Sequence, residues 1–288
     1  MQKDHPFTEA IDLEIIMLAY AHFGGDLALM IETLQNNPLH PLKNYPIERI
    51  ETILNWQEHQ TEDLESFLPA GAKKAVQNAK DMTNEMQAAM HEDPDSLHSK
   101  IYALLFYEGE EPYSLVDEVV LEQEAAIKPL IKLLKNTHLF DPLYPGFGRS
   151  LARIADALKG IGDDQAIAPL FNALLEQNPS IEDALLDALI SFQGAPHFLL
   201  KILEERPFSI RSTYAAKALF FLKTADVSLA AIDALCDPTI QKHPGLINYL
   251  IALLDALDPE DKNSVLQQLL DEVPFSSEHK AEIEIFLK

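Results

Sequence analysis

The chain has 288 residues, of which 47% are hydrophobic and 24% charged, so it carries enough apolar material to form a folded core. Its 46 Asp and Glu residues outnumber its 22 Lys and Arg residues, and the formal net charge is −24. Such a negative field repels phosphate backbones and anionic lipid headgroups. We therefore expect neither a nucleic acid nor a membrane as the partner of this protein.

The sequence offers no targeting or membrane-spanning signal. Residues 1–8 lack the basic and apolar regions of a signal peptide. The longest apolar runs, Ile15–Tyr20 and Ile247–Leu254, are far shorter than the roughly 20 residues that cross a bilayer. The single cysteine, Cys236, leaves no partner for an intramolecular disulfide, and its apolar neighbours favour a small core residue. These features predict a soluble cytoplasmic protein.

Residues 1–112 predict an irregular helical N-terminal region. Apolar residues at helical spacing flank Gly24-Gly25-Asp26, which indicates a helical hairpin with Asp26 as the N-cap of its second helix. Further helices are predicted over residues 47–57, 72–90 and 97–107. The donor-rich run from His91 to His98 contains Pro94 and Asp95, which we interpret as a turn and an N-cap rather than as a metal site.

Residues 113–288 repeat one pattern of two helices. Four segments place apolar residues at relative positions 0, 3, 4 and 7, and each pattern describes one buried stripe on a helix. The third apolar residues of these segments are separated by 31, 30 and 35 positions, and they are Leu158, Leu189, Leu219 and Leu254. A second helical pattern precedes each segment. Two helices every 30–40 residues indicate an α-solenoid, in which neighbouring units bury one another's apolar faces.

One stretch of this region resembles a known repeat family. Residues 152–170 read ARIADALKGIGDDQAIAPL, with an Ala- and Leu-rich helix, a turn of Gly and Asp residues, and then Pro169 and Leu170. This sequence pattern resembles the HEAT-like repeat first associated with phycobilisome bilin lyases. The resemblance covers roughly residues 115–288 and is clearest over 149–175. The later turns, such as 193–195, lie at the same position in the repeat but have different residues. It implies an all-α, right-handed α-α superhelix over residues 113–288, of the armadillo-like superfamily, whose members have many unrelated functions.

An insertion interrupts the repeats at residues 137–148. Leu130 and Leu170 are 40 residues apart, whereas Leu170 and Leu199 are 29 apart, so about ten extra residues separate the two helices of one unit. The predicted partner-binding residues of this segment are Phe140, Tyr144, Phe147, Arg149 and Arg153. Aromatic side chains beside Arg are the types that dominate binding hot spots. The alternative is that the aromatic rings fold back and cover an exposed ridge of the solenoid.

No catalytic constellation is apparent in the sequence, and we expect no cofactor, no metal and no catalytic residue. Our leading hypothesis is a non-enzymatic protein–protein interaction scaffold that binds a protein or peptide. Residues 1–124 hold 24 acidic and 7 basic residues, a net charge of −17, which favours basic segments of a partner. The alternative is a HEAT-repeat enzyme of the lyase or metal-dependent hydroxylase type. The oligomeric state stays open.

Overall fold

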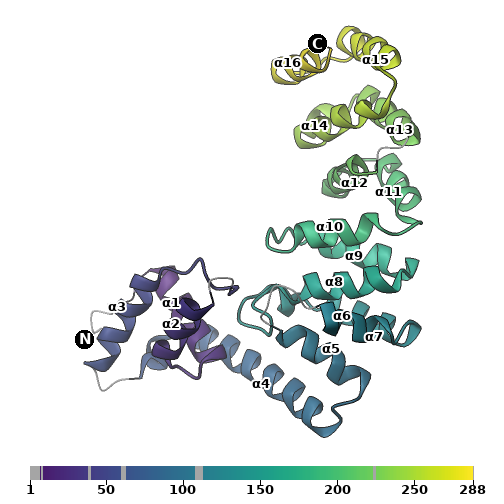
Figure 1. The fold of residues 1–288 in the computed structure, drawn as a ribbon. Helices are drawn as coiled ribbons and strands as arrows, with labels where there is room; N and C mark the ends of the chain where they lie inside the picture. Colours follow the sequence, from purple (N-terminus) through teal and green to yellow (C-terminus); the bar gives the residue numbers. More distant parts are fainter. Residues whose placement is uncertain are drawn as a thin grey trace. The chain divides into compact units, whose positions relative to one another are not determined.

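Figure 1 shows the computed structural model of the chain, whose regular secondary structure is helical throughout the described residues. The structure describes residues 7, 9–37, 40–59, 63–107, 113–222 and 225–287, and these residues form no β-strand. The predicted all-α class is confirmed. Within these residues no single helix is both long and apolar enough to cross a membrane. The helices α1 (Ala10–His22) and α2 (Leu27–Asn36) reach that length and apolar character only as a pair, with a bend of 89° between them.

The chain divides into two compact units. The first unit comprises residues 1–161 together with 178–181, and the second comprises residues 162–177 and 182–288. The boundary that the sequence predicts at residue 112 falls outside the described residues.

The first unit contains eight labelled helices among its described residues. They are α1 (Ala10–His22), α2 (Leu27–Asn36), α3 (Ile47–Glu58), α4 (Ala70–Glu92), α5 (Leu97–Phe106), α6 (Tyr113–Val120), α7 (Glu124–Leu134) and α8 (Ser150–Ile161). The predicted cap of α2 is confirmed, because the carboxylate of Asp26 accepts a hydrogen bond from the Leu29 amide at 2.9 Å. The predicted cap of α5 is wrong by one residue. Ser96 rather than Asp95 caps α5, and its hydroxyl accepts a bond from the Ser99 amide at 3.2 Å.

Helix α1 is the central helix of the N-terminal half of the first unit. Its Ile15, Ile16 and Leu18 side chains are fully buried, and the helix contacts α3 and α4. Asp12 is also fully buried on α1, where its carboxylate receives two hydrogen bonds from the Arg49 guanidinium at 2.5 and 2.6 Å. A buried carboxylate needs such a partner, because removing it from water without one is costly. The Asp12–Arg49 pair therefore fixes α1 against α3.

The second unit consists of helices that pair along the chain. They are α9 (Ile167–Leu174), α10 (Glu182–Ile190), α11 (Ala195–Glu204), α12 (Ile210–Phe220), α13 (Ala225–Cys236), α14 (Pro244–Leu253), α15 (Pro259–Glu272) and α16 (Ser277–Phe286). Each odd-numbered helix contacts the even-numbered helix that follows it. Figure 1 shows the even-numbered helices of this unit in one column and the odd-numbered helices in a second column beside it.

The repeated apolar stripes are buried in both units. The marker residues Leu158 on α8, Leu189 on α10, Leu219 on α12 and Leu254 just after α14 are each at most 1% exposed. On the preceding helices, Leu170 and Phe171 of α9 and Leu199 of α11 are fully buried. The helical period of the sequence therefore predicts the buried face of these helices correctly.

Candidate functional site

The insertion at residues 137–148 is packed against the first unit. Residues 137–140 form a single 3₁₀ turn, which begins at Asn136, whose side chain accepts a bond from the His138 amide at 3.2 Å. Residues 143–148 are buried, with only 4% of Tyr144 and 7% of Phe147 exposed. Tyr144 stacks on His138, with the ring centres 4.8 Å apart. The Tyr144 and Phe147 side chains are thus folded back against the rest of the first unit, as the alternative interpretation expects.

Phe147 holds the insertion to residues that are far away in the sequence. Its ring centre lies 4.2 Å from that of His22 at the end of α1 and 4.8 Å from that of His40. The Nε2 atom of His22 lies 2.8 Å from the carbonyl oxygen of Pro142. These contacts explain why the aromatic side chains of the insertion face inwards, since the rest of the first unit supplies their partners.

The two arginines that follow the insertion differ in exposure. Arg153 is 7% exposed, and its guanidinium lies 3.3 Å from the Leu105 carbonyl oxygen and over the ring of Tyr107. It therefore satisfies backbone acceptors at the C-terminal end of α5. Arg149 and Phe140 are half-buried and keep part of their surface in solvent. Partner binding by the five predicted residues stays a prediction. Of these five, Arg149 and Phe140 are the ones that a partner could reach.

A groove lies between α5 and α7 of the first unit. It has a volume of about 290 Å³. Its lining residues are His98, Ile101 and Tyr102 from α5 and Lys128, Pro129, Lys132 and Leu133 from α7. Both sets recur at spacings of three and four residues, so each belongs to one face of its helix. Ile101 is buried and forms the apolar floor, while Tyr102 and Leu133 are half-buried on its two sides.

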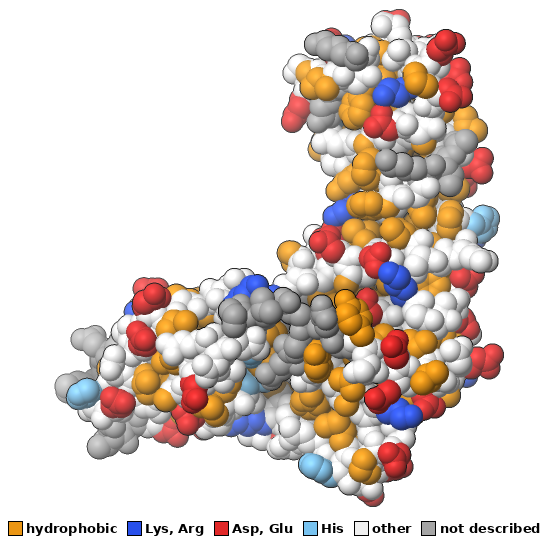
Figure 2. Space-filling model, viewed as in Figure 1, with side chains coloured by type: hydrophobic (Ala, Val, Ile, Leu, Met, Phe, Trp, Pro, Cys, Tyr) orange, Lys and Arg blue, Asp and Glu red, His pale blue; other side chains and the backbone are white. Residues whose placement is uncertain are grey.

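The charge of this groove is opposite to that of the chain. Lys128 and Lys132 are exposed, lie one helical turn apart, and form no ion pair with any described residue. The lining contains no carboxylate. Figure 2, in contrast, shows acidic side chains spread over the visible face of the molecule. The groove therefore combines an apolar floor with two ammonium groups available to a carboxylate.

Two aromatic rings line the solvent side of the groove. His98 and Tyr102 lie edge to face, with ring centres 6.3 Å apart, and both are on the solvent side of the buried Ile101. The lining has no Ser or Cys nucleophile paired with a base. It can bury a small number of apolar side chains and neutralise an adjacent negative charge.

The structure corrects the predicted place of Cys236. We expected a core residue, but the side chain is exposed at the C-terminal end of α13. Partial desolvation, together with the negative charges of Glu272 and Asp233, raises the pKa of this thiol, so it is protonated and weakly nucleophilic at neutral pH. Apolar neighbours in the sequence did not reveal which face of α13 carries Cys236.

The donor-rich run from His91 to His98 does not gather its side chains into a cluster. In the described part of the chain, no three His, Cys, Asp or Glu side chains converge in a way that would hold a metal ion. The run instead ends α4 and begins α5, and His98 belongs to the groove.

Sequence reasoning missed the two groove lysines. The two lysines are four residues apart on a helix with one apolar stripe, so the sequence could have predicted that both ammonium groups lie beside that stripe. The sequence does not predict that a face of α5 completes the groove. That face belongs to a helix more than twenty residues earlier in the chain.

We compared the chain with protein families, curated proteins and solved structures. No protein family, no curated protein and no solved structure matches the chain. The resemblance to HEAT-like repeats therefore stays a prediction.

Proposed function

We propose that this protein is a non-enzymatic interaction scaffold built as an α-solenoid, and that the groove between α5 and α7 binds a short segment of a protein partner. The observation that carries the proposal is the pairing of an apolar floor with two exposed lysines that have no ion-pair partner among the described residues. The expected occupant has an apolar side chain beside one or two carboxylates. This groove is a different surface from the acidic N-terminal residues that we expect to favour a basic partner.

The arrangement of the second unit supports a solenoid scaffold. Its helices pair along the chain, and even-numbered helices contact the next even-numbered helix, as α10 with α12 and α12 with α14. Such stacking buries each hairpin against its neighbours and leaves long faces available to a partner. The periodic burial of Leu189, Leu219 and Leu254 follows the same repeat.

The size and charge of the groove limit its occupant. A volume of about 290 Å³ accommodates one or two large side chains rather than a folded domain. The net charge of −24 repels a strongly acidic protein, so the segment needs few carboxylates, placed next to the lysines. Burial of one or two aliphatic side chains contributes about 2–3 kcal/mol each. Each exposed ion pair adds less than about 1 kcal/mol. The cost of association offsets at least about 4 kcal/mol of this gain, so the expected Kd is about 1 mM or weaker.

A selection from a library of random octapeptides tests this function on the full-length protein. We expect enrichment of peptides with a large apolar residue beside Asp or Glu. The double variant Lys128→Glu with Lys132→Glu should lose these peptides, because its groove repels the carboxylate. Lys201→Glu with Lys242→Glu is the matched control, since both lysines are exposed, lie in the second unit, and change the net charge by the same amount.

The outcomes of the selection are separable. Loss of binding in the groove variant with retention in the control supports the proposal, and synthetic copies of the selected peptides should bind several-fold more weakly at high salt. Peptides that bind both variants equally, or a selection that yields only basic peptides, would contradict it. A pull-down from cell extract with the same two variants then identifies the natural partner.

A further inference from the structure

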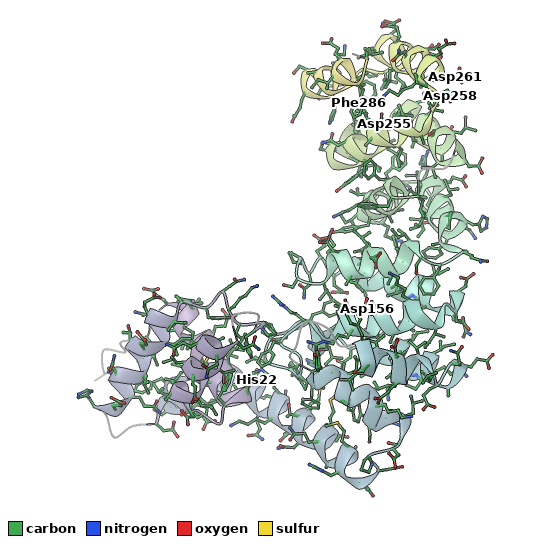
Figure 3. The ribbon with its side chains drawn as sticks, in the orientation of Figure 1. His22, Asp156, Asp255, Asp258, Asp261 and Phe286 are labelled. Atoms are coloured by element: carbon green, nitrogen blue, oxygen red, sulfur yellow. The ribbon has the colours of Figure 1, made fainter. Side chains whose placement is uncertain are left out.

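A second, smaller cavity lies in the first unit where the insertion meets α1, α4 and α5. Its volume is about 150 Å³. The residues that matter for recognition are His22 at the end of α1, Thr83 and Gln87 on α4, and the phenyl rings of Phe106 and Phe147. Thr83 and Gln87 are four residues apart and share one face of α4. Figure 3 labels His22, which ends α1 beside α4. No residue of this cavity belongs to the groove described above.

The wall formed by the insertion is held in place by its backbone. Gly146 has φ +79°, and a Cβ atom at this position would stand 2.8 Å from the carbonyl oxygen of Leu105. The hydroxyl of Ser150 donates a hydrogen bond to the Pro145 carbonyl oxygen at 2.6 Å. The cavity is therefore a preformed feature of the packed loop.

His22 enters the cavity as a neutral ring. The Pro142 carbonyl oxygen can only accept a hydrogen bond, so the Nε2 atom of His22, 2.8 Å away, carries the proton. The other ring nitrogen, Nδ1, is then a hydrogen-bond acceptor. Burial lowers the pKa of His22 to about 4, which keeps the ring uncharged at neutral pH.

The lining thus combines polar groups without charge and aromatic walls. It contains no Lys, Arg, Asp or Glu side chain. The Gln87 amide and the Thr83 hydroxyl each donate and accept, and the His22 ring accepts. Gln87 is exposed and marks the open side of the cavity, whereas Phe147 is buried on its inner side. A ligand that suits this lining is uncharged, flat, and bears donors and acceptors along one edge.

The volume sets the size of this ligand. An enclosed apolar protein cavity of about 150 Å³ is known to hold one benzene molecule, so this cavity has room for one six-membered ring. A primary amide such as that of Gln87 pairs well with a ring amide, because each presents one donor and one acceptor side by side. We propose that this cavity binds an uncharged six-membered lactam ring, as found in uracil, with Gln87 and Thr83 on its polar edge, beside the lining residues Phe106 and Phe147.

Ligand-observed NMR titration of the full-length protein with free uracil tests the proposal. We expect uracil to bind at least tenfold more tightly than benzene, which has the shape of the ring without its amide edge. Gln87→Leu should weaken uracil binding at least tenfold and leave benzene binding unchanged or improved. Gln77→Leu is the matched control on α4, because Gln77 is also exposed and lies outside the cavity.

Three results with uracil and benzene would overturn the proposal. They are an absence of uracil binding at millimolar concentration, equal binding of uracil and benzene, and equal binding by Gln87→Leu and the wild type. Uridine 5′-monophosphate distinguishes a free ring from a nucleotide, and we expect it to bind more weakly than uracil because its phosphate meets an uncharged, confined lining. Tighter binding of the nucleotide would contradict the assignment. The groove variant Lys128→Glu with Lys132→Glu should bind uracil normally, so this test is independent of the proposed function.

Discussion

Replacement of His22 by Gln should remove a specific part of the acid sensitivity of the first unit. A histidine in an unfolded chain has a pKa of about 6.5. In the folded protein, burial lowers the pKa of His22 to about 4. Between these two values the unfolded chain binds more protons than the folded one. Stability therefore falls as the pH drops through this window.

The size of the effect follows from the two pKa values. The linkage relation gives a loss of about 2 kcal/mol between pH 7 and pH 5 from His22 alone, and at most about 3 kcal/mol at pH 4. Glutamine does not titrate, and its amide can still donate a hydrogen bond to the Pro142 carbonyl oxygen. The difference between wild type and His22→Gln should therefore isolate the contribution of this imidazole, because the other titrating groups cancel.

Urea unfolding followed by tryptophan fluorescence is a suitable assay. The only tryptophan in the sequence, Trp56, lies on α3 in the first unit and packs against Phe67, with ring centres 5.0 Å apart. Its emission therefore reports the unfolding of the unit that contains His22. His197→Gln is the control, because His197 is exposed and lies in the second unit. Parallel pH profiles for wild type and His22→Gln would refute the reasoning and would mean that the imidazole is hydrated in the folded protein.

Three further predictions concern packing. Phe171→Ala should destabilise the second unit by about 3–5 kcal/mol in urea unfolding followed by circular dichroism, because Phe171 is fully buried, whereas the half-exposed Phe221→Ala should change little. Phe147→Ser should lower the free energy of unfolding by about 3 kcal/mol or more in the Trp56 assay, since the Phe147 ring packs between two histidines. An unchanged urea midpoint would mean that the insertion is not packed against the rest of the first unit. Arg49→Met should lower the urea midpoint by withdrawing the guanidinium from the buried Asp12 carboxylate, and adding Asp12→Asn should recover part of the loss.

Local features of the sequence account for the helices and their inner faces. The apolar spacing on α12 and α14 predicts the buried residues Leu219 and Leu250, because a helix exposes only one stripe of its surface to the core. The cap at Asp26 is equally local, since it depends on three residues of backbone geometry. The cap of α5 shows the limit of this reasoning. Asp95 and Ser96 are both good cap residues, and a shift of one position decides between them.

The composition of a segment does not determine which neighbours it meets. The aromatic residues of the insertion predict either a binding arm or a packed loop, and the sequence near them contains no feature that separates the two. The partners that bury Phe147 are His22 and His40, which precede it by more than a hundred residues. Cys236 shows the same limit, because its apolar neighbours suggest burial while the packing of α13 leaves the thiol exposed.

The sequence by itself determined the all-α class, the positions of most helices and the stripe that each one buries, since these depend on contacts within a few turns of chain. The tertiary structure alone decided where two faces meet. It placed α5 beside α7, so that Lys128 and Lys132 border an apolar groove, and it closed the insertion over His22 to leave a small polar cavity. The physical reason is that a site requires side chains from distant segments, and their mutual distance depends on packing that no local pattern encodes.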